Sequence, residues 1–152
     1  MATTRGSGAK KTAAKAKKTK PRAAAAGPKG APTLADLRRI ARSIVTATSV
    51  ADEKRMLSLY ADSVESEEAG QMPTYGIEAI KQKNEQWKKM VSDARWHARN
   101  LWCDGQTVII EWEAQLTLRG GRKTLFREVA IHEIRNGKIV RERYYYDPTI
   151  LG

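Results

Sequence analysis

Acidic side chains at two places in this sequence could carry proton-transfer chemistry. Glu67 and Glu68 follow Glu65 in a short acidic stretch, and Glu128 lies within a predicted strand. A carboxyl buried among apolar groups has a raised pKa, which suits it to general acid or base work. The alternatives are a solvated strand end for Glu67 or Glu68, and for Glu128 a structural carboxylate that accepts a hydrogen bond from a tyrosine. Both readings of each site stay open at this stage.

Histidine and cysteine offer less chemistry. His132 follows Glu128 by four residues, about 13 Å along an extended strand, so the two side chains do not touch directly. A hydrogen-bonded core histidine is the favoured interpretation. His97 alternates with Arg95 and Arg99, which indicates a solvent-facing or dimer-facing position. Cys103 is the single cysteine and the two histidines are far apart in sequence, so we expect no disulfide and no metal site. The sequence contains no cofactor motif, and no cofactor is expected.

Three predicted helices and a run of strands must position these groups. Apolar residues at spacings of three and four after Thr33 predict an N-capped amphipathic helix that reaches about Thr48. Two further helices are predicted at about 52–62 and 77–91, with a short strand at about 64–68 between them. Four antiparallel strands follow at about 94–102, 106–118, 123–134 and 138–147, separated by turn signals that each contain glycine. The sheet must bury one face against the helices.

The alternation on strand 106–118 identifies that face. Its even positions are apolar and its odd positions from 111 to 117 are polar, so the even face is predicted to point inward. A three-residue loop Arg119-Gly120-Gly121 sets Trp112 opposite Glu128, and it sets Glu113 opposite Arg127. A two-residue Gly-Gly turn is the alternative, but it opposes Glu113 and Glu128, two like charges. We prefer the first.

The same three-residue loop type at Arg135-Asn136-Gly137 pairs Glu128 with Tyr144, and Phe126 with Tyr146. The expected result is an aromatic-walled cavity around one central carboxylate. Glu68 and Glu128 are the candidate catalytic residues, and the expected pocket residues are Tyr60, Asn84, Trp87, Trp112, Phe126, His132, Tyr144 and Tyr146. Core packing is the competing interpretation of the Tyr144–Tyr146 run.

Several residue strings resemble one superfamily in order and spacing. They are Tyr60-Ala61-Asp62, Gly76-Ile77-Glu78-Ala79-Ile80, and Gly137-Lys138-Ile139-Val140 followed by Tyr145-Tyr146-Asp147. Over nearly all of residues 33–152 the chain resembles the SnoaL-like, nuclear transport factor two-like superfamily. The resemblance implies an α+β fold in which a cone-shaped, curved antiparallel sheet is covered by three helices from the N-terminal half.

The resemblance also limits which activities carry over. The isomerases of this superfamily use an acid on the first strand, where Glu67 or Glu68 falls, but their second acid and the cyclases' catalytic acid match Ala130. The catalytic positions of the epoxide hydrolases hold Trp112, Ala114 and Tyr144. The known catalytic sets are therefore incomplete in this chain.

Charge is concentrated at the N-terminus. Residues 1–32 contain nine Lys or Arg and no acid, so 19 of the 28 bases remain to face 17 acids in the rest of the chain. We expect 1–32 to be a disordered basic tail and linker ahead of one domain at 33–152. The tail either contacts nucleic-acid phosphates weakly and without sequence preference, or acts only to increase solubility. The tail residues named for phosphate contact are Lys10, Lys11, Lys15, Lys17, Lys18 and Lys20.

Two functions remain. The first is a pocket protein for a small apolar ligand, acting as a cofactor-independent isomerase, cyclase or lyase. The second is a non-catalytic homodimeric binding module tethered to nucleic acid by its tail. No apolar run approaches the roughly 18 residues that a membrane span needs, and a cytoplasmic location, with nucleoid association under the second hypothesis, is expected.

Overall fold

The computed structural model describes residues 31–152. The hypotheses for the basic tail, including its six named lysines, therefore lie outside the described residues. No helix of the described part is both long and apolar enough to cross a membrane.

The first helix begins where the sequence pattern places it. Helix α1 spans Leu34–Ser49, and Thr33 caps it in a reciprocal arrangement with Asp36. The Asp36 amide donates to Thr33 Oγ1 at 3.1 Å, and the Thr33 amide donates to Asp36 Oδ2 at 3.1 Å. One stripe of the helix is buried, at Leu37, Ile40, Ala41, Ile44 and Ala47. This stripe fixes α1 against the sheet.

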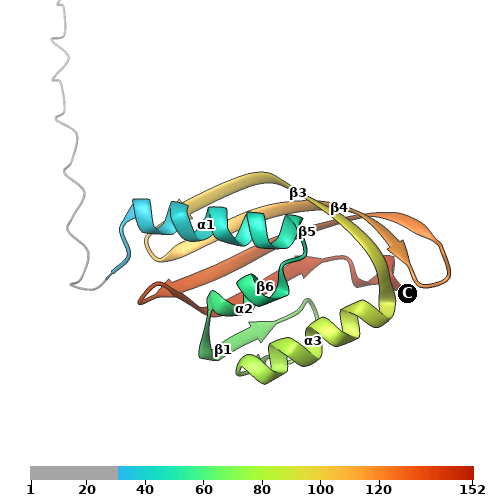
Figure 1. The fold of residues 1–152 in the computed structure, drawn as a ribbon, viewed down its shortest axis with the longest axis horizontal. Coiled ribbons are helices and arrows are strands. Elements are labelled where there is room, and N and C mark those ends of the chain that lie inside the picture. Colours follow the sequence, from blue (N-terminus) through green and yellow to red (C-terminus); the bar gives the residue numbers. More distant parts are fainter. Residues whose placement is uncertain (1–30) are drawn as a thin grey trace, which may run out of the picture.

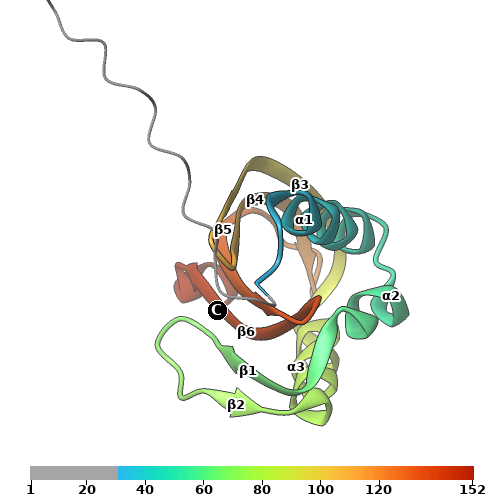
Figure 2. The same ribbon diagram turned by 90° about the vertical axis from the view of Figure 1, so that its left-hand side faces the viewer.

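The sheet has six strands and wraps around the helices. In chain order the strands are β1 (Tyr60–Glu67), β2 (Thr74–Tyr75), β3 (Val91–Asp104), β4 (Thr107–Leu118), β5 (Lys123–Arg135) and β6 (Lys138–Tyr146). Their order in the sheet is β2-β1-β6-β5-β4-β3, and the β1–β6 pair is parallel while the others are antiparallel. Seen end on, the sheet curls into the predicted α+β cone, with α1 across its concave side (Figures 1 and 2).

Three further helical segments follow α1 in the chain. Helix α3 spans Ile77–Met90, in agreement with the prediction, and a 3₁₀ helix, η1, follows β6 at Pro148–Leu151. Helix α2 covers only Glu53–Ser58, so the predicted helix 52–62 is wrong in its second half. Tyr60 lies in β1 instead, because the Ile139 amide donates to the Leu59 carbonyl and Tyr60 pairs with Ile139 of β6.

The first predicted hairpin register is confirmed. Leu118 and Arg122 close a three-residue loop, Trp112 pairs with Glu128, and Glu113 pairs with Arg127. The even positions of β4 from Val108 to Leu118 are all buried, so the predicted inward face is also confirmed.

The second predicted register, which pairs Glu128 with Tyr144 and Phe126 with Tyr146, is wrong. Asn136 and Gly137 form a two-residue turn with φ of +49° and +74°, so Arg135 pairs with Lys138. With that turn alone, Glu128 would pair with Tyr145, and the side chains of β6 that face inward would face outward. A bulge between Glu133 and Ile134 adds one more residue of shift and restores the facing, so Glu128 pairs with Tyr146.

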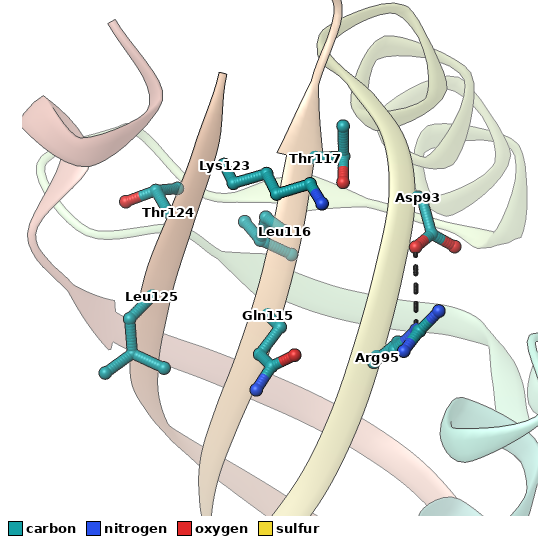
Figure 3. Close-up of a pocket in the computed structure, with 8 residues that line it drawn as sticks. All are labelled: Asp93, Arg95, Gln115, Leu116, Thr117, Lys123, Thr124 and Leu125. Carbon is teal, nitrogen blue, oxygen red and sulfur yellow. Dashed lines mark ion pairs between the residues drawn. The ribbon is translucent and has the colours of Figure 1, made fainter. Parts of the chain in front are cut away.

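The outer face of the sheet is polar with scattered apolar side chains. A depression of about 430 Å³ crosses β3, β4 and β5 and contains an ion pair between Asp93 and Arg95 at 3.8 Å (Figure 3). Leu125 and Tyr145 are exposed on this face. The homodimer expected from the sequence stays a prediction.

Candidate functional site

The inner face of the cone contains a cavity of about 500 Å³ between the sheet and helices α1 and α3. Both candidate acids and all eight expected pocket residues line it. These are Glu68, Glu128, Tyr60, Asn84, Trp87, Trp112, Phe126, His132, Tyr144 and Tyr146. Asn84 also has a structural contact, because its amide donates to Glu53 Oε1 at 3.1 Å. Their role in binding stays a prediction.

Aromatic rings build one wall of this cavity. Trp96 on β3 packs edge-to-face on Trp112 of β4 at 5.8 Å and on Phe126 of β5 at 5.8 Å. Trp87 of α3 lies 5.9 Å from Phe126, and Tyr146 of β6 lies 5.2 Å from Phe126. The wall is therefore assembled from one helix and four strands, and its rings hold one another in fixed orientations.

Glu128 carries the unusual electrostatics of the site. Its partners across the sheet are Trp112 and Tyr146. Burial raises its pKa to about 8, and the negative charge of Glu68 adds to the effect while Lys83 opposes it. Within residues 31–152 no hydrogen bond to its carboxyl contributes to this pKa. The structural alternative, a carboxylate that accepts a tyrosine hydrogen bond, applies to a different residue.

That residue is Glu142, which is fully buried. Its Oε2 accepts hydrogen bonds from the Tyr60 hydroxyl at 2.6 Å and the Tyr144 hydroxyl at 2.7 Å. Its Oε1 accepts from Ser66 Oγ at 2.7 Å and from Lys83 Nζ at 2.7 Å. Burial alone would raise the pKa of Glu142, but Lys83 and these hydrogen bonds lower it to about 2. Glu142 is thus held ionised in the wall.

Lys83 connects this buried group to the cavity. Besides Glu142, its ammonium contacts Glu68 Oε1 at 3.0 Å and Ser66 Oγ at 2.8 Å, and it lies 4.4 Å from the centre of the Tyr144 ring. Burial opposes its charge, yet Glu142 and Glu68 outweigh burial and raise the Lys83 pKa. Three carboxyl groups and one ammonium therefore share the site, where the sequence had indicated one central carboxylate.

His132 is buried as expected, but the expected hydrogen bonds are missing. Neither ring nitrogen has a partner among the described residues, and Nδ1 lies 3.8 Å from Glu142 Oε2, too far for a hydrogen bond. Burial lowers the His132 pKa to about 4, so the ring is neutral at physiological pH. His97 lies exposed on β3, opposite Glu113, as predicted.

Sequence reasoning overlooked the roles of Lys83, Ser66 and Glu142. Glu142 stands two residues before Tyr144 on the inward face of β6, so the strand alternation already placed it inside. Lys83 and Ser66 gave no such signal, since a lysine on α3 beside Asn84 resembles an ordinary solvated position. Among the described residues, no cluster of three His, Cys, Asp or Glu side chains has the arrangement of a metal site.

Comparisons with known proteins agree with this fold. The sequence model of the SnoaL-like domain family matches residues 41–142. A SnoaL-like polyketide cyclase candidate from Jannaschia sp. CCS1 superimposes with a TM-score of 0.69 at 14% identity, covering 80% of this chain and 92% of the other. A similar candidate from Mesorhizobium loti has a TM-score of 0.61 at 25% identity, covering 72% and 98%.

A third structure, from Catenulispora acidiphila, is a protein with a ketosteroid isomerase-like fold in complex with trimethylamine. It superimposes with a TM-score of 0.65 at 15% identity, covering 74% of this chain and 88% of the other. Among curated proteins, no significant sequence match was found.

Proposed function

The chain belongs to the SnoaL-like domain family, and from this premise we propose that it binds a small, mainly apolar organic molecule in the inner cavity and exchanges a proton with it through Glu128. The observation that carries the proposal is the Glu128 carboxyl, which lines an aromatic cavity and has its pKa raised to about 8. A protonated carboxyl at neutral pH is a hydrogen-bond donor and a general acid. A purely structural acid would have a partner, as Glu142 does.

A second acid supplies the complementary half of the reaction. Glu68 forms an ion pair with Lys83, so it faces the same cavity as a carboxylate. For a carbonyl substrate, Glu68 would remove a proton from the carbon beside the carbonyl while Glu128 gives its proton to the carbonyl oxygen. The product of that step is an enol, and the reverse transfers at a different carbon complete an isomerisation. No cofactor is required by this chemistry.

The family context supports a pocket protein and leaves the reaction open. The positions that hold the cyclase and epoxide hydrolase catalytic groups carry Ala130, Trp112, Ala114 and Tyr144 here, so Glu68 and Glu128 are this chain's own candidates. The trimethylamine bound to the Catenulispora neighbour supports the view that small organic molecules occupy such folds. At 15% identity that protein informs the fold alone.

The first test is a thermal-shift screen of the full-length protein against a panel of apolar ketones and enones, followed by assays of proton exchange and isomerisation for each hit. We expect specific stabilisation by some panel members and loss of turnover in Glu128→Gln, which keeps the side-chain shape but removes the transferable proton. Glu113→Gln is the matched control, because Glu113 lies on the outer face of the same hairpin and should leave turnover unchanged.

The outcomes separate the candidate functions. Hits that bind without any turnover or proton exchange would favour the non-catalytic binding module. Equal effects of the two substitutions on turnover would remove Glu128 from the reaction. No hit across the panel would overturn the proposal of an apolar carbonyl ligand.

A further inference from the structure

The balance of charge inside the cavity favours a positively charged ligand. The ionisable acidic and basic residues that line it are Glu68, Glu128 and Lys83. Glu142 forms an ion pair with Lys83 at 2.7 Å. Three carboxyl groups therefore face a single ammonium. The one histidine of the cavity adds no positive charge at physiological pH, because the pKa of His132 is lowered to about 4. An excess of negative charge remains even when Glu128 is protonated.

The cavity already stabilises one ammonium group. Lys83 Nζ lies over the ring of Tyr144 at 4.4 Å, a cation–π distance, and its pKa is raised although the group is largely buried. The rings of Trp87, Trp96, Trp112 and Phe126 also line the cavity, together with Glu128. Among the described residues the Glu128 carboxyl forms no salt bridge, although the charge of Lys83 acts on its pKa.

We propose that the cavity binds a small tertiary or quaternary ammonium ion, with its positive charge beside Glu128 and Glu68 and its apolar substituents against the rings of Trp87, Trp96, Trp112 and Phe126. This inference rests on the proposed function only in using the same cavity, and it goes beyond it by naming a second class of ligand, toward which Glu128 acts as a counter-ion and not as an acid. An ammonium with alkyl substituents suits the site on two counts. Its weak hydration lowers the free-energy cost of desolvation, and its charge is attracted both to aromatic faces and to carboxylates.

Binding of a cation has a measurable consequence for Glu128. A positive charge beside this carboxyl favours its ionised form, so its pKa falls from about 8 when the ligand enters. At pH 7 the empty protein holds Glu128 mainly protonated, and the complex holds a larger fraction of it ionised. Binding therefore releases up to one proton per site. A neutral ligand of the same shape causes no such release.

The test compares choline with 3,3-dimethylbutan-1-ol, its uncharged isostere, by isothermal titration calorimetry on the full-length protein at pH 7. Titrations in phosphate and in Tris, whose ionisation enthalpies differ, give the number of protons released. We expect choline to bind at least tenfold more tightly than the alcohol and to release a proton. The Glu128→Gln variant should lose the proton release and most of the preference for choline, whereas Glu113→Gln should keep both.

Three results would overturn the inference. Equal affinity for the two probes would show an apolar cavity without charge selectivity, and it would leave the proposed function intact. Choline binding that Glu128→Gln does not change would place the cation elsewhere on the protein. Failure of choline to bind while ketones from the thermal-shift panel do bind would exclude the ammonium class alone, whereas failure of both probe classes would remove the proposed function as well.

Discussion

Two glutamates on one hairpin show what the two faces of this sheet do to the same side chain. Glu113 on β4 is on the outer face, where Arg127 and Arg99 each contact its Oε2 at 3.0 Å. The hydrogen bond from Arg127 lowers its pKa. Glu128 on β5 is on the inner face between Trp112 and Tyr146, and burial raises its pKa to about 8. The two glutamates lie on opposite faces of the sheet, and this difference makes Glu113 a member of surface ion pairs and Glu128 a candidate acid.

The difference extends to the two hollows of the molecule. The outer depression of about 430 Å³ is lined by charged, polar and apolar side chains, among them Arg95, Lys123 and Leu125 (Figure 3). The inner cavity of about 500 Å³ is lined mainly by aromatic and other apolar side chains, with the carboxyl groups of Glu68 and Glu128 among them. Similar volumes thus differ in chemistry, because charge interactions weaken in solvent and strengthen where water is excluded.

The largest effect should come from Lys83→Met, which leaves Glu142 as an uncompensated buried charge. Removing one partner of a buried pair costs about 3–5 kcal/mol in free energy of unfolding. The matched control on the same helix is Lys88→Met, since Lys88 pairs with Glu53 and Glu85 at an exposed site and its loss should cost much less. Urea denaturation of both variants measures the contrast, and equal losses would mean that the inner network contributes no more than a surface pair.

A second prediction uses pH to compare the wild type with Glu128→Gln. Folding raises the Glu128 pKa from 4.5 to about 8, so between these values the unfolded state holds fewer protons than the folded state. The wild-type contribution of this group to stability therefore declines as pH rises from about 4.5 to about 8. At pH 7 the cost is on the order of 3 kcal/mol, which Gln avoids.

The measurement is the difference in unfolding free energy between Glu128→Gln and wild type at pH 5, 6, 7 and 8. It should grow with pH throughout this range and level off only above about pH 8. Taking the difference removes the opposing contribution of His132, whose lowered pKa makes the protein gain stability from pH 4 to 6.5 in both proteins. A difference that does not vary with pH would mean that Glu128 titrates normally, and the candidate acid would be lost.

The smallest effect should be that of Glu113→Gln on stability. Its ion pairs with Arg99 and Arg127 are solvent-exposed, so they contribute little to the free energy of unfolding. We expect this loss to shrink further in 0.5 M salt, because salt screens exposed charges. Thermal melts at low and high salt measure it. A loss comparable to that of Lys83→Met would contradict the division of the sheet into a solvated and a buried face.

Local patterns in the sequence determined much of the fold. The capping sequence at Thr33, the spacing of apolar residues in α1 and α3, and the alternation along β4 are local signals, and each was read correctly because it depends on neighbours within one element. The same alternation placed Glu128 and Trp112 on the inner face. The first hairpin register followed from a like-charge argument that needed only two strands.

Tertiary structure decided what local patterns leave undetermined. The register of β5 and β6 depends on the sum of a two-residue turn at Asn136-Gly137 and a bulge after Glu133, and each alone would invert the facing. Because β1 pairs in parallel with β6, Tyr60 is a strand residue, whereas the sequence pattern had placed it at the end of a helix. This pairing also brought Ser66 beside Glu142, where Lys83 of α3 meets both. The charged groups of Glu68, Lys83, Glu128 and Glu142 come from four segments that are distant in the sequence. They meet because the curvature of the sheet and the packing of α3 fix the positions of all four segments together.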